Sequence, residues 1–183
     1  VIGGQVERMT KIMRGLLDFA RRTPARKARA DLRELTRRIL DLLAPLAKKS
    51  SVKLELTSDS GAQVAEVDAA QVEQAVANLI VNGVQATSGG GDVTADVRAV
   101  VATAPGASSA ANYICISVRD TGTGIAPEHV GRVFEPFFTT KDVGSGTGLG
   151  LSVTYGIVQE HGGFVDVASE LDHGSCFSLY FPA

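Results

Sequence analysis

The sequence lacks several features that would place it in a specialised class of protein. It contains no Trp, and only 5% of its residues are aromatic, so no platform for stacking nucleic-acid bases can be picked out. Its two cysteines, Cys115 and Cys176, lie in separate apolar runs and have no partner at metal or redox spacing. We therefore expect buried, reduced thiols in a cytoplasmic protein.

Long apolar runs and an excess of positive charge are also missing. No run approaches the roughly 20 apolar residues that cross a bilayer, and no signal peptide is visible. The net charge of -2 supplies no positive field, so we expect no nucleic-acid partner. The chain begins at Val1 without an initiator Met, which we interpret as a piece of a longer protein, and the sequence leaves a membrane anchor in that protein open.

Hydrophobic periodicity divides the chain into three parts. Residues 1–22 show a heptad stripe, which predicts a helix that packs on a partner helix. The basic, Pro-containing residues 23–30 are typical of a linker. Residues 31–183 predict one domain, in which irregularly interleaved strands and helices favour a two-layer α/β sandwich.

The expected helices are placed by their caps and apolar faces. Asp31 is an N-cap candidate for a helix to residue 49. Its expected inner face is Leu32, Leu35, Ile39, Leu42 and Leu46. Asp68 caps a second helix to about residue 87, and a third is expected over 149–161. Strands are expected over 52–56, 64–67, 93–101, 113–119, 164–168 and 176–181.

The second helix carries an unusual row of uncharged polar residues. Gln74, Asn78, Asn82 and Gln85 share one face, at spacings of four, four and three. A solvated face normally recruits Lys and Glu, because Asn lowers helix propensity. A neutral amide oxygen suits a hard cation whose charge phosphates already balance, so the row favours a magnesium site over a merely solvated face.

Three further motifs are weak when taken singly. Asp120 ends a strand and opens the glycine-rich string DTGTGI, which can present a carboxylate to an exocyclic amine or simply form a turn. FEPFFTTK places three aromatics beside Lys141, a point charge for a phosphate. GSGTGLGL precedes a helix, where backbone amides bind phosphate.

Taken in order, these motifs form a specific signal. The strings NLIVNGVQA, DTGTGI, FEPFFTTK and GTGLGL resemble the N, G1, F and G2 boxes of histidine kinases in the GHKL ATPase superfamily. The resemblance covers residues 31–183, and the first helix, which ends RGLLDFAR, looks like the second helix of the dimerisation and histidine-phosphotransfer hairpin. It implies a Bergerat-type fold, in which helices cover one face of a mixed sheet.

The resemblance also implies a role for each motif position. Asn82 would coordinate Mg²⁺, supported by Asn78, and Asp120 would recognise the adenine of ATP. A lid over residues 127–147 would be anchored by Phe137 or Phe138, and Lys141 would reach a phosphate. The remaining implied pocket residues are Ala86, Gly122, Gly124, Ile125, Gly146, Thr147, Gly148, Leu149 and Gly150.

By the same resemblance, ATP phosphorylates a histidine on a hairpin helix that precedes residue 1. His129, His161 and His173 lack that context, and we expect them at the surface. The implied partners are the His-bearing helix of the same kinase, which is a homodimer at full length, and a response regulator. The stretch would bind ATP without phosphorylating itself.

Three alternatives remain open on the sequence. ATP-hydrolysing relatives such as gyrase and MutL carry a Glu one turn before the magnesium Asn, where this sequence has Asn78. A nucleotide-binding or dimerisation module without phosphotransfer would not need all four boxes. A dehydrogenase-type fold would need a strand before GTGLGL and an acidic residue about 20 positions later.

Overall fold

The computed structural model describes residues 25–58, 61–87, 89–140 and 147–183 of the 183-residue chain. Three predictions made from the sequence concern residues outside these ranges. They are the helix over residues 1–22, the phosphate contact of Lys141 and the role of Gly146.

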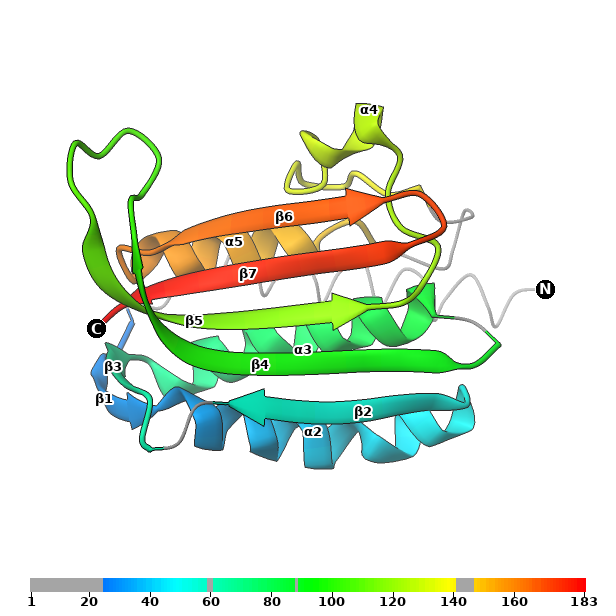
Figure 1. The fold of residues 1–183 in the computed structure, drawn as a ribbon, viewed down its shortest axis with the longest axis horizontal. Helices are drawn as coiled ribbons and strands as arrows, with labels where there is room; N and C mark the ends of the chain where they lie inside the picture. The colour runs from blue at the N-terminus through cyan, green and yellow to red at the C-terminus, as the bar shows by residue number, and fades with distance from the viewer. Residues whose placement is uncertain (1–24, 59–60, 88, 141–146) are drawn as a thin grey trace, which may run out of the picture.

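A five-stranded mixed sheet forms one layer of the domain (Figure 1). Its strands lie in the order β2 (Val52–Ser58), β4 (Gly91–Ala102), β5 (Ala111–Asp120), β7 (Gly174–Pro182) and β6 (Phe164–Glu170). Strands β2 and β4 are parallel, whereas the other neighbouring pairs are antiparallel. The central strand β5 therefore delivers its last residue, Asp120, to an interior position along one end of the sheet.

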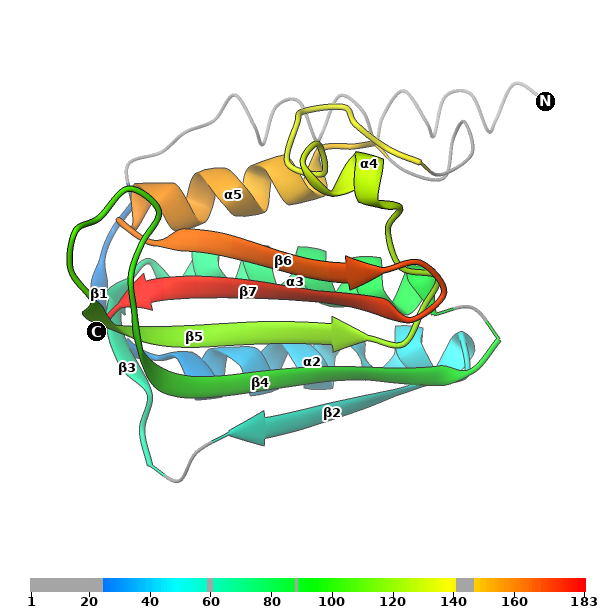
Figure 2. The same cartoon turned by 45° about the horizontal axis from the view of Figure 1, so that its top comes forward.

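Three helices form the second layer. Helices α2 (Leu32–Lys49), α3 (Ala69–Ala86) and α5 (Gly150–Glu160) all cover the same face of the sheet, as Figures 1 and 2 show. The predicted two-layer α/β sandwich with helices on one face is confirmed. The core lies between the layers, and its largest fully buried side chains include Phe181, Leu32, Leu35, Leu79, Ile80, Ile116 and Leu179. No helix in the described part of the chain is long and apolar enough to cross a membrane.

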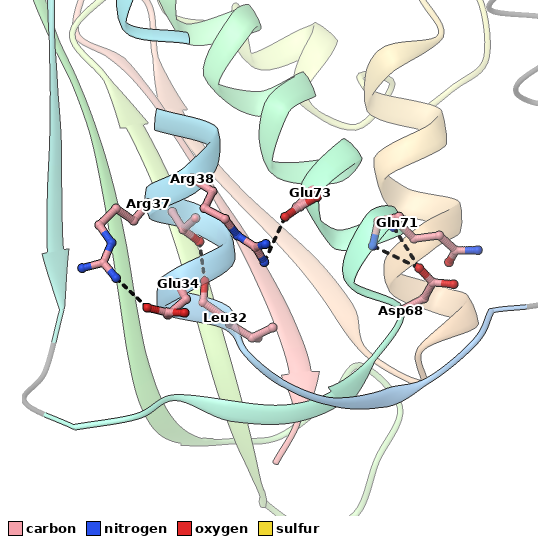
Figure 3. A network of polar contacts seen from close by, with 9 residues as sticks. Leu32, Glu34, Arg37, Arg38, Asp68, Gln71 and Glu73 are labelled. Carbon is pink, nitrogen blue, oxygen red and sulfur yellow. Dashed lines mark hydrogen bonds and ion pairs between the residues drawn. The ribbon is translucent and has the colours of Figure 1, made fainter. Parts of the chain in front are cut away.

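Helix α3 begins where the sequence predicts it to begin. The Asp68 side chain accepts hydrogen bonds from the backbone N–H groups of Ala70 and Gln71, at 3.1 and 3.3 Å. These contacts satisfy donors that have no partner within the helix. An ion pair of 3.2 Å joins Arg38 of α2 to Glu73 of α3 (Figure 3). Asp31 caps α2 in the same way, accepting from the Arg33 N–H group.

The residues expected to form a linker include a short strand. Strand β1 (Ala28–Asp31) pairs with β3 (Val64–Val67) in a separate two-stranded antiparallel sheet. Just before it, the Arg26 N–H group donates to the Asp68 carboxylate at 2.8 Å. The first described element of the domain therefore starts before residue 31, because pairing with a distant strand outweighs the local composition.

The predicted inner face of α2 is wrong at two positions. Leu42 is 71% exposed and Leu46 is 38% exposed, whereas Leu40 and Ala47 are buried. The prediction followed a seven-residue repeat, and a straight helix drifts about 20° from that repeat in every heptad. At Leu42 and Leu46, ten and fourteen residues after Leu32, the core-facing stripe has moved to the neighbouring residues Leu40 and Ala47.

The expectation that all three histidines lie at the surface fails for His161. This residue is only 4% exposed, at the C-terminal end of α5. Its Nε2 accepts the Asp68 N–H group at 2.9 Å, and its Nδ1 lies 2.7 Å from the carbonyl oxygen of Ile157. The imidazole therefore ties the end of α5 to the start of α3. His173, in contrast, is exposed.

Replacing Gly156 with Ala is expected to stabilise the domain by about 0.5–1 kcal/mol. Gly156 lies within α5, and a Cβ atom added to it would meet nothing within 4 Å. Alanine has the higher helix propensity and reduces the conformational entropy of the unfolded chain. Urea unfolding of the two proteins measures the difference, and a loss of stability would show that α5 is packed more tightly here than described.

Candidate functional site

Helix α3 forms the floor of the candidate site. Asn78, Asn82 and Ala86 are spaced by four residues, so they share one face of the helix. The Asn78 side-chain amide donates to the carbonyl oxygen of Gly150 at 3.1 Å and reaches the Thr154 hydroxyl at 3.5 Å. The first residue of the row is thereby fixed against the start of α5.

The other end of the row contacts the segment after β5. The Thr123 N–H group donates to the carbonyl oxygen of Ala86 at 3.2 Å. One turn earlier, a Cβ on Gly83 would lie 3.4 Å from the Asp120 Cβ, so the absence of a side chain there lets the two elements approach. Asn82 therefore lies between a contact to α5 and a contact to the Asp120 segment.

Asp120 is a buried carboxylate held by backbone groups. Its side chain is at the helix-covered face of the sheet, and the residue is 6% exposed. The Gly122 N–H group donates to Oδ1 at 2.9 Å, and the Ser175 N–H group donates to the same carboxylate. Burial raises the pKa of Asp120 above its ordinary value, although both hydrogen bonds act to lower it. The carboxylate is thus fixed in orientation and poorly solvated.

Asp120 and Asp68 are expected to titrate on opposite sides of the ordinary aspartate pKa of 3.8. At Asp68 burial acts to raise the pKa, but N–H groups of Arg26, Gln71 and Ala70, together with His161, outweigh it and lower the pKa. Asp68 therefore contributes stability above pH 3.8 that is lost as the pH falls through its folded pKa. Asp120 has the opposite effect on stability. Because its pKa is raised in the folded state, its ionisation makes the folded state less stable as the pH rises from 3.8 through its folded pKa.

Carboxyl carbon NMR of the ligand-free protein measures both titrations. The expected result is a midpoint above 3.8 for Asp120 and below 3.8 for Asp68. A midpoint below 3.8 for Asp120 would show that its carboxylate is solvated rather than buried.

The turn between β6 and β7 braces the segment that follows Asp120. Gly124 has a φ of 66°, and a Cβ on it would overlap the carbonyl oxygen of Glu170. The Asp172 N–H group donates to the Thr123 carbonyl oxygen at 2.8 Å. The Ile125 N–H group donates to the Ser169 hydroxyl at 2.8 Å. Only a glycine at position 124 permits this close approach.

The start of α5 presents backbone amides near Asn78. Leu149 stands at the N-cap position, and its side chain makes no capping hydrogen bond. The Leu149 side chain is buried at 2% exposure, so of this residue only the backbone can face a ligand. Gly148 has a φ of 66°, and its carbonyl oxygen accepts the Phe137 N–H group at 2.9 Å. Free backbone N–H groups at the N-terminus of a helix such as α5 favour the binding of an anion.

Phe138, rather than Phe137, anchors the described part of the expected lid. Phe138 packs partly buried against the core, whereas Phe137 is 57% exposed. The ring of His129, from helix α4 (Pro127–Val130), meets Phe138 at a centroid distance of 5.5 Å. The Arg132 guanidinium lies 4.6 Å from the Phe138 ring centroid.

The described residues of the predicted site thus come together from three separate parts of the chain. Asn78 and Gly150 are in contact, Ala86 and Thr123 are in contact, and Asn82 lies between the two contacts. Ser169 and Ser175 were missed by the sequence analysis. They lie in the segment SELDHGSCF, between the strands predicted over 164–168 and 176–181.

Comparison with known proteins gives the class of this chain. The model of the family described as histidine kinase-, DNA gyrase B- and HSP90-like ATPase matches residues 67–183, and the chain belongs to this family. The sequence is 39% identical over 186 residues to the sensor kinase CckA of Brucella abortus (strain 2308), covering 96% of this chain and 19% of CckA. It is 33% identical to the sensor histidine kinase ZraS of Escherichia coli (strain K12), and the match covers 100% of this chain and 37% of ZraS.

Solved structures agree with the sequence comparisons. The catalytic domain of the histidine kinase ThkA superposes with a TM-score of 0.72 at 28% identity, covering 85% of this chain and 95% of that one. Full-length ShkA in complex with AMPPNP superposes with a TM-score of 0.78 at 28% identity, and the match covers 95% of this chain and 35% of ShkA. This chain is a histidine kinase type ATP-binding catalytic domain, and it spans about a fifth to two fifths of its curated relatives.

Proposed function

We propose that this domain transfers the γ-phosphoryl group of ATP to a histidine on a helix outside residues 1–183, for relay to a response regulator. The observation that carries the proposal is the convergence of Asn78, Asp120 and Gly150 around α3. The relatives CckA and ZraS, both sensor kinases, support it. The structure of ShkA in complex with AMPPNP, an analogue of ATP, supports it further. The proposal places the domain in the cytoplasm, as part of a homodimer at full length.

Each part of the site has a separate task in this proposal. Asp120 accepts a hydrogen bond from the adenine amine, in a pocket shaped by Gly122, Gly124, Ile125 and Ala86. The N–H groups at the start of α5, with Thr147, Gly148 and Gly150, hold the phosphates in line. In this proposal Lys141 reaches a phosphate, Gly146 takes part in wrapping the triphosphate, and Phe138 anchors a lid over residues 127–147.

The amide row of α3 fits a magnesium ion carried by the nucleotide. No group of three His, Cys, Asp or Glu side chains in the described ranges is placed to hold a metal by itself. A neutral amide oxygen from Asn82, beside phosphate oxygens, is a suitable donor set for Mg²⁺. Magnesium would offset the charge of the phosphates during transfer. Asn78 donates its N–H group to Gly150, which fixes the orientation of its amide beside Asn82.

The same contact argues against water as the phosphate acceptor. Asn78 occupies the position where hydrolysing relatives carry a Glu, and an amide cannot take a proton from water at neutral pH. Its hydrogen bond to Gly150 instead gives it a positioning role. A histidine from a partner helix, which is itself a nucleophile, needs no such base.

Transfer of labelled phosphate tests the proposal. The chain is incubated with ATP labelled at the γ-phosphate, Mg²⁺ and a polypeptide that carries the complete dimerisation hairpin. We expect acid-labile label on the hairpin with the unchanged chain and with the matched control Asn112→Ala, an exposed asparagine at the end of β5 away from Asp120. Asn82→Ala is expected to lose at least about tenfold in rate. Steady release of phosphate, or binding without transfer, would overturn the proposal in favour of a hydrolase or a binding module.

A further inference from the structure

The Ser169 hydroxyl lies where the β6–β7 hairpin meets the segment that begins at Asp120. Ser169 and Ser175 are directly paired across the two strands, so their side chains share a face of the sheet. Their hydroxyl oxygens are 2.9 Å apart. Ser169 Oγ also lies 2.8 Å from the Ile125 nitrogen and 3.0 Å from the Gly174 carbonyl oxygen.

These contacts use the full hydrogen-bonding capacity of the hydroxyl. A serine hydroxyl has one donor hydrogen and two acceptor lone pairs. The Gly174 carbonyl can only accept, so it takes the hydrogen of Ser169. The Ile125 N–H group and the Ser175 hydroxyl then donate to the two lone pairs. Because every position is filled, this side chain is fixed in one orientation.

The other end of this hydrogen-bond network, at Ser175, contacts the carboxylate of Asp120, to which the proposed function gives the recognition of adenine. The N–H group of Ser175 donates to Asp120, which also accepts the Gly122 N–H group. A continuous path therefore runs from Ile125 through the two serines to Asp120. It joins the first and last residues of the motif DTGTGI across a neighbouring hairpin, although the motif itself contains no regular secondary structure after Asp120.

We propose that Ser169 is a positioning residue for adenine recognition. It holds the backbone at Ile125 and, through Ser175, fixes the Asp120 carboxylate at the distance that an adenine amine requires. This inference rests on the proposed function, because it assumes that Asp120 reads the base. Ser169 sets how well the site discriminates adenine from other bases, and the contacts of the phosphates at α5 do not depend on it.

Calorimetric titration with ATP and with GTP, both with Mg²⁺, tests the proposal on the whole chain. Ser169→Ala is expected to weaken ATP binding about tenfold, because buried partners lose their hydrogen bonds. GTP binding is expected to change less than about twofold, so discrimination falls. Ser169→Thr keeps the hydroxyl and is expected to restore most of the ATP affinity.

The matched control is Ser178→Ala. Ser178 lies in the same hairpin and bonds the Ser117 hydroxyl at 3.0 Å, away from the site. A thermal melt of each variant comes first, and titrations are made well below the lowest melting temperature. If Ser169→Ala does not fold, the titration of that variant is replaced by hydrogen exchange of the Ile125 amide. The exchange rate is compared between Ser169→Thr and the unchanged chain, and we expect equal protection.

The outcomes separate this inference from the proposed function. If the unchanged chain does not bind ATP, the proposed function fails. If it binds ATP, but Ser169→Ala binds ATP as tightly or loses ATP and GTP affinity equally, the positioning role is wrong. Faster exchange of the Ile125 amide in Ser169→Thr than in the unchanged chain would also contradict it.

Discussion

Replacing Asp120 with Asn is expected to abolish ATP binding while the domain stays folded. The carboxylate is 6% exposed and is fixed by N–H groups of Gly122 and Ser175, so it cannot turn away from a ligand. An Asn side chain of the same shape places an NH₂ group where an acceptor is needed. A donor facing the adenine amine costs binding roughly a hundredfold or more. Calorimetry at millimolar nucleotide measures the loss.

The control for this prediction is Asp166→Asn. Asp166 is an exposed aspartate on β6, and its carboxylate accepts only the neighbouring Val167 N–H group among the described contacts. We expect it to bind ATP as the unchanged chain does. Retention of full affinity in Asp120→Asn would show that the base is read elsewhere.

Replacing Gly124 with Ala is expected to remove ATP binding and to destabilise the domain by more than about 2 kcal/mol. Two causes act together. The φ of 66° disfavours any residue with a Cβ, and the added methyl group overlaps the Glu170 carbonyl oxygen. Either the β6–β7 turn or the segment after Asp120 must move, and the contacts at Ile125 and Thr123 break with it.

Urea unfolding and nucleotide titration of Gly124→Ala measure the two effects. Gly156→Ala serves as the matched control, because its added methyl group meets no atom within 4 Å. We expect the two alanine variants to change stability in opposite directions. If Gly124→Ala is as stable as the unchanged chain and binds ATP, the turn does not brace the site.

Local signals in the sequence were sufficient for helices α2, α3 and α5 and for most of the floor of the site, whereas the short helix α4 was not predicted. Asp31 and Asp68 each precede an apolar repeat, and each caps the helix predicted after it. The spacing of Asn78 and Asn82 on one helix face follows from helix geometry alone. These features depend on residues within one or two turns of each other, which is why composition and periodicity reveal them.

Features that depend on distant contacts could not be predicted in this way. Strand β1 exists because β3 lies beside it, and the paired residues are distant in the sequence: Ala28 pairs with Val67 and Asp31 with Val64, 39 and 33 positions apart. The burial of His161 depends on the start of α3, and the role of Ser169 depends on a turn that braces Ile125. A periodic pattern also misplaced Leu42, since a seven-residue repeat and a straight helix diverge.

Amide NMR of the chain titrated with Mg²⁺ and AMPPNP tests the central claim most directly. We predict that the largest shifts fall on Gly122, Gly124, Gly150 and the side-chain amides of Asn78 and Asn82. Residues on the uncovered face of the sheet, such as Ser178 and Asp166, are predicted to stay unchanged. Shifts confined to that face, or no shifts at millimolar nucleotide, would contradict the account.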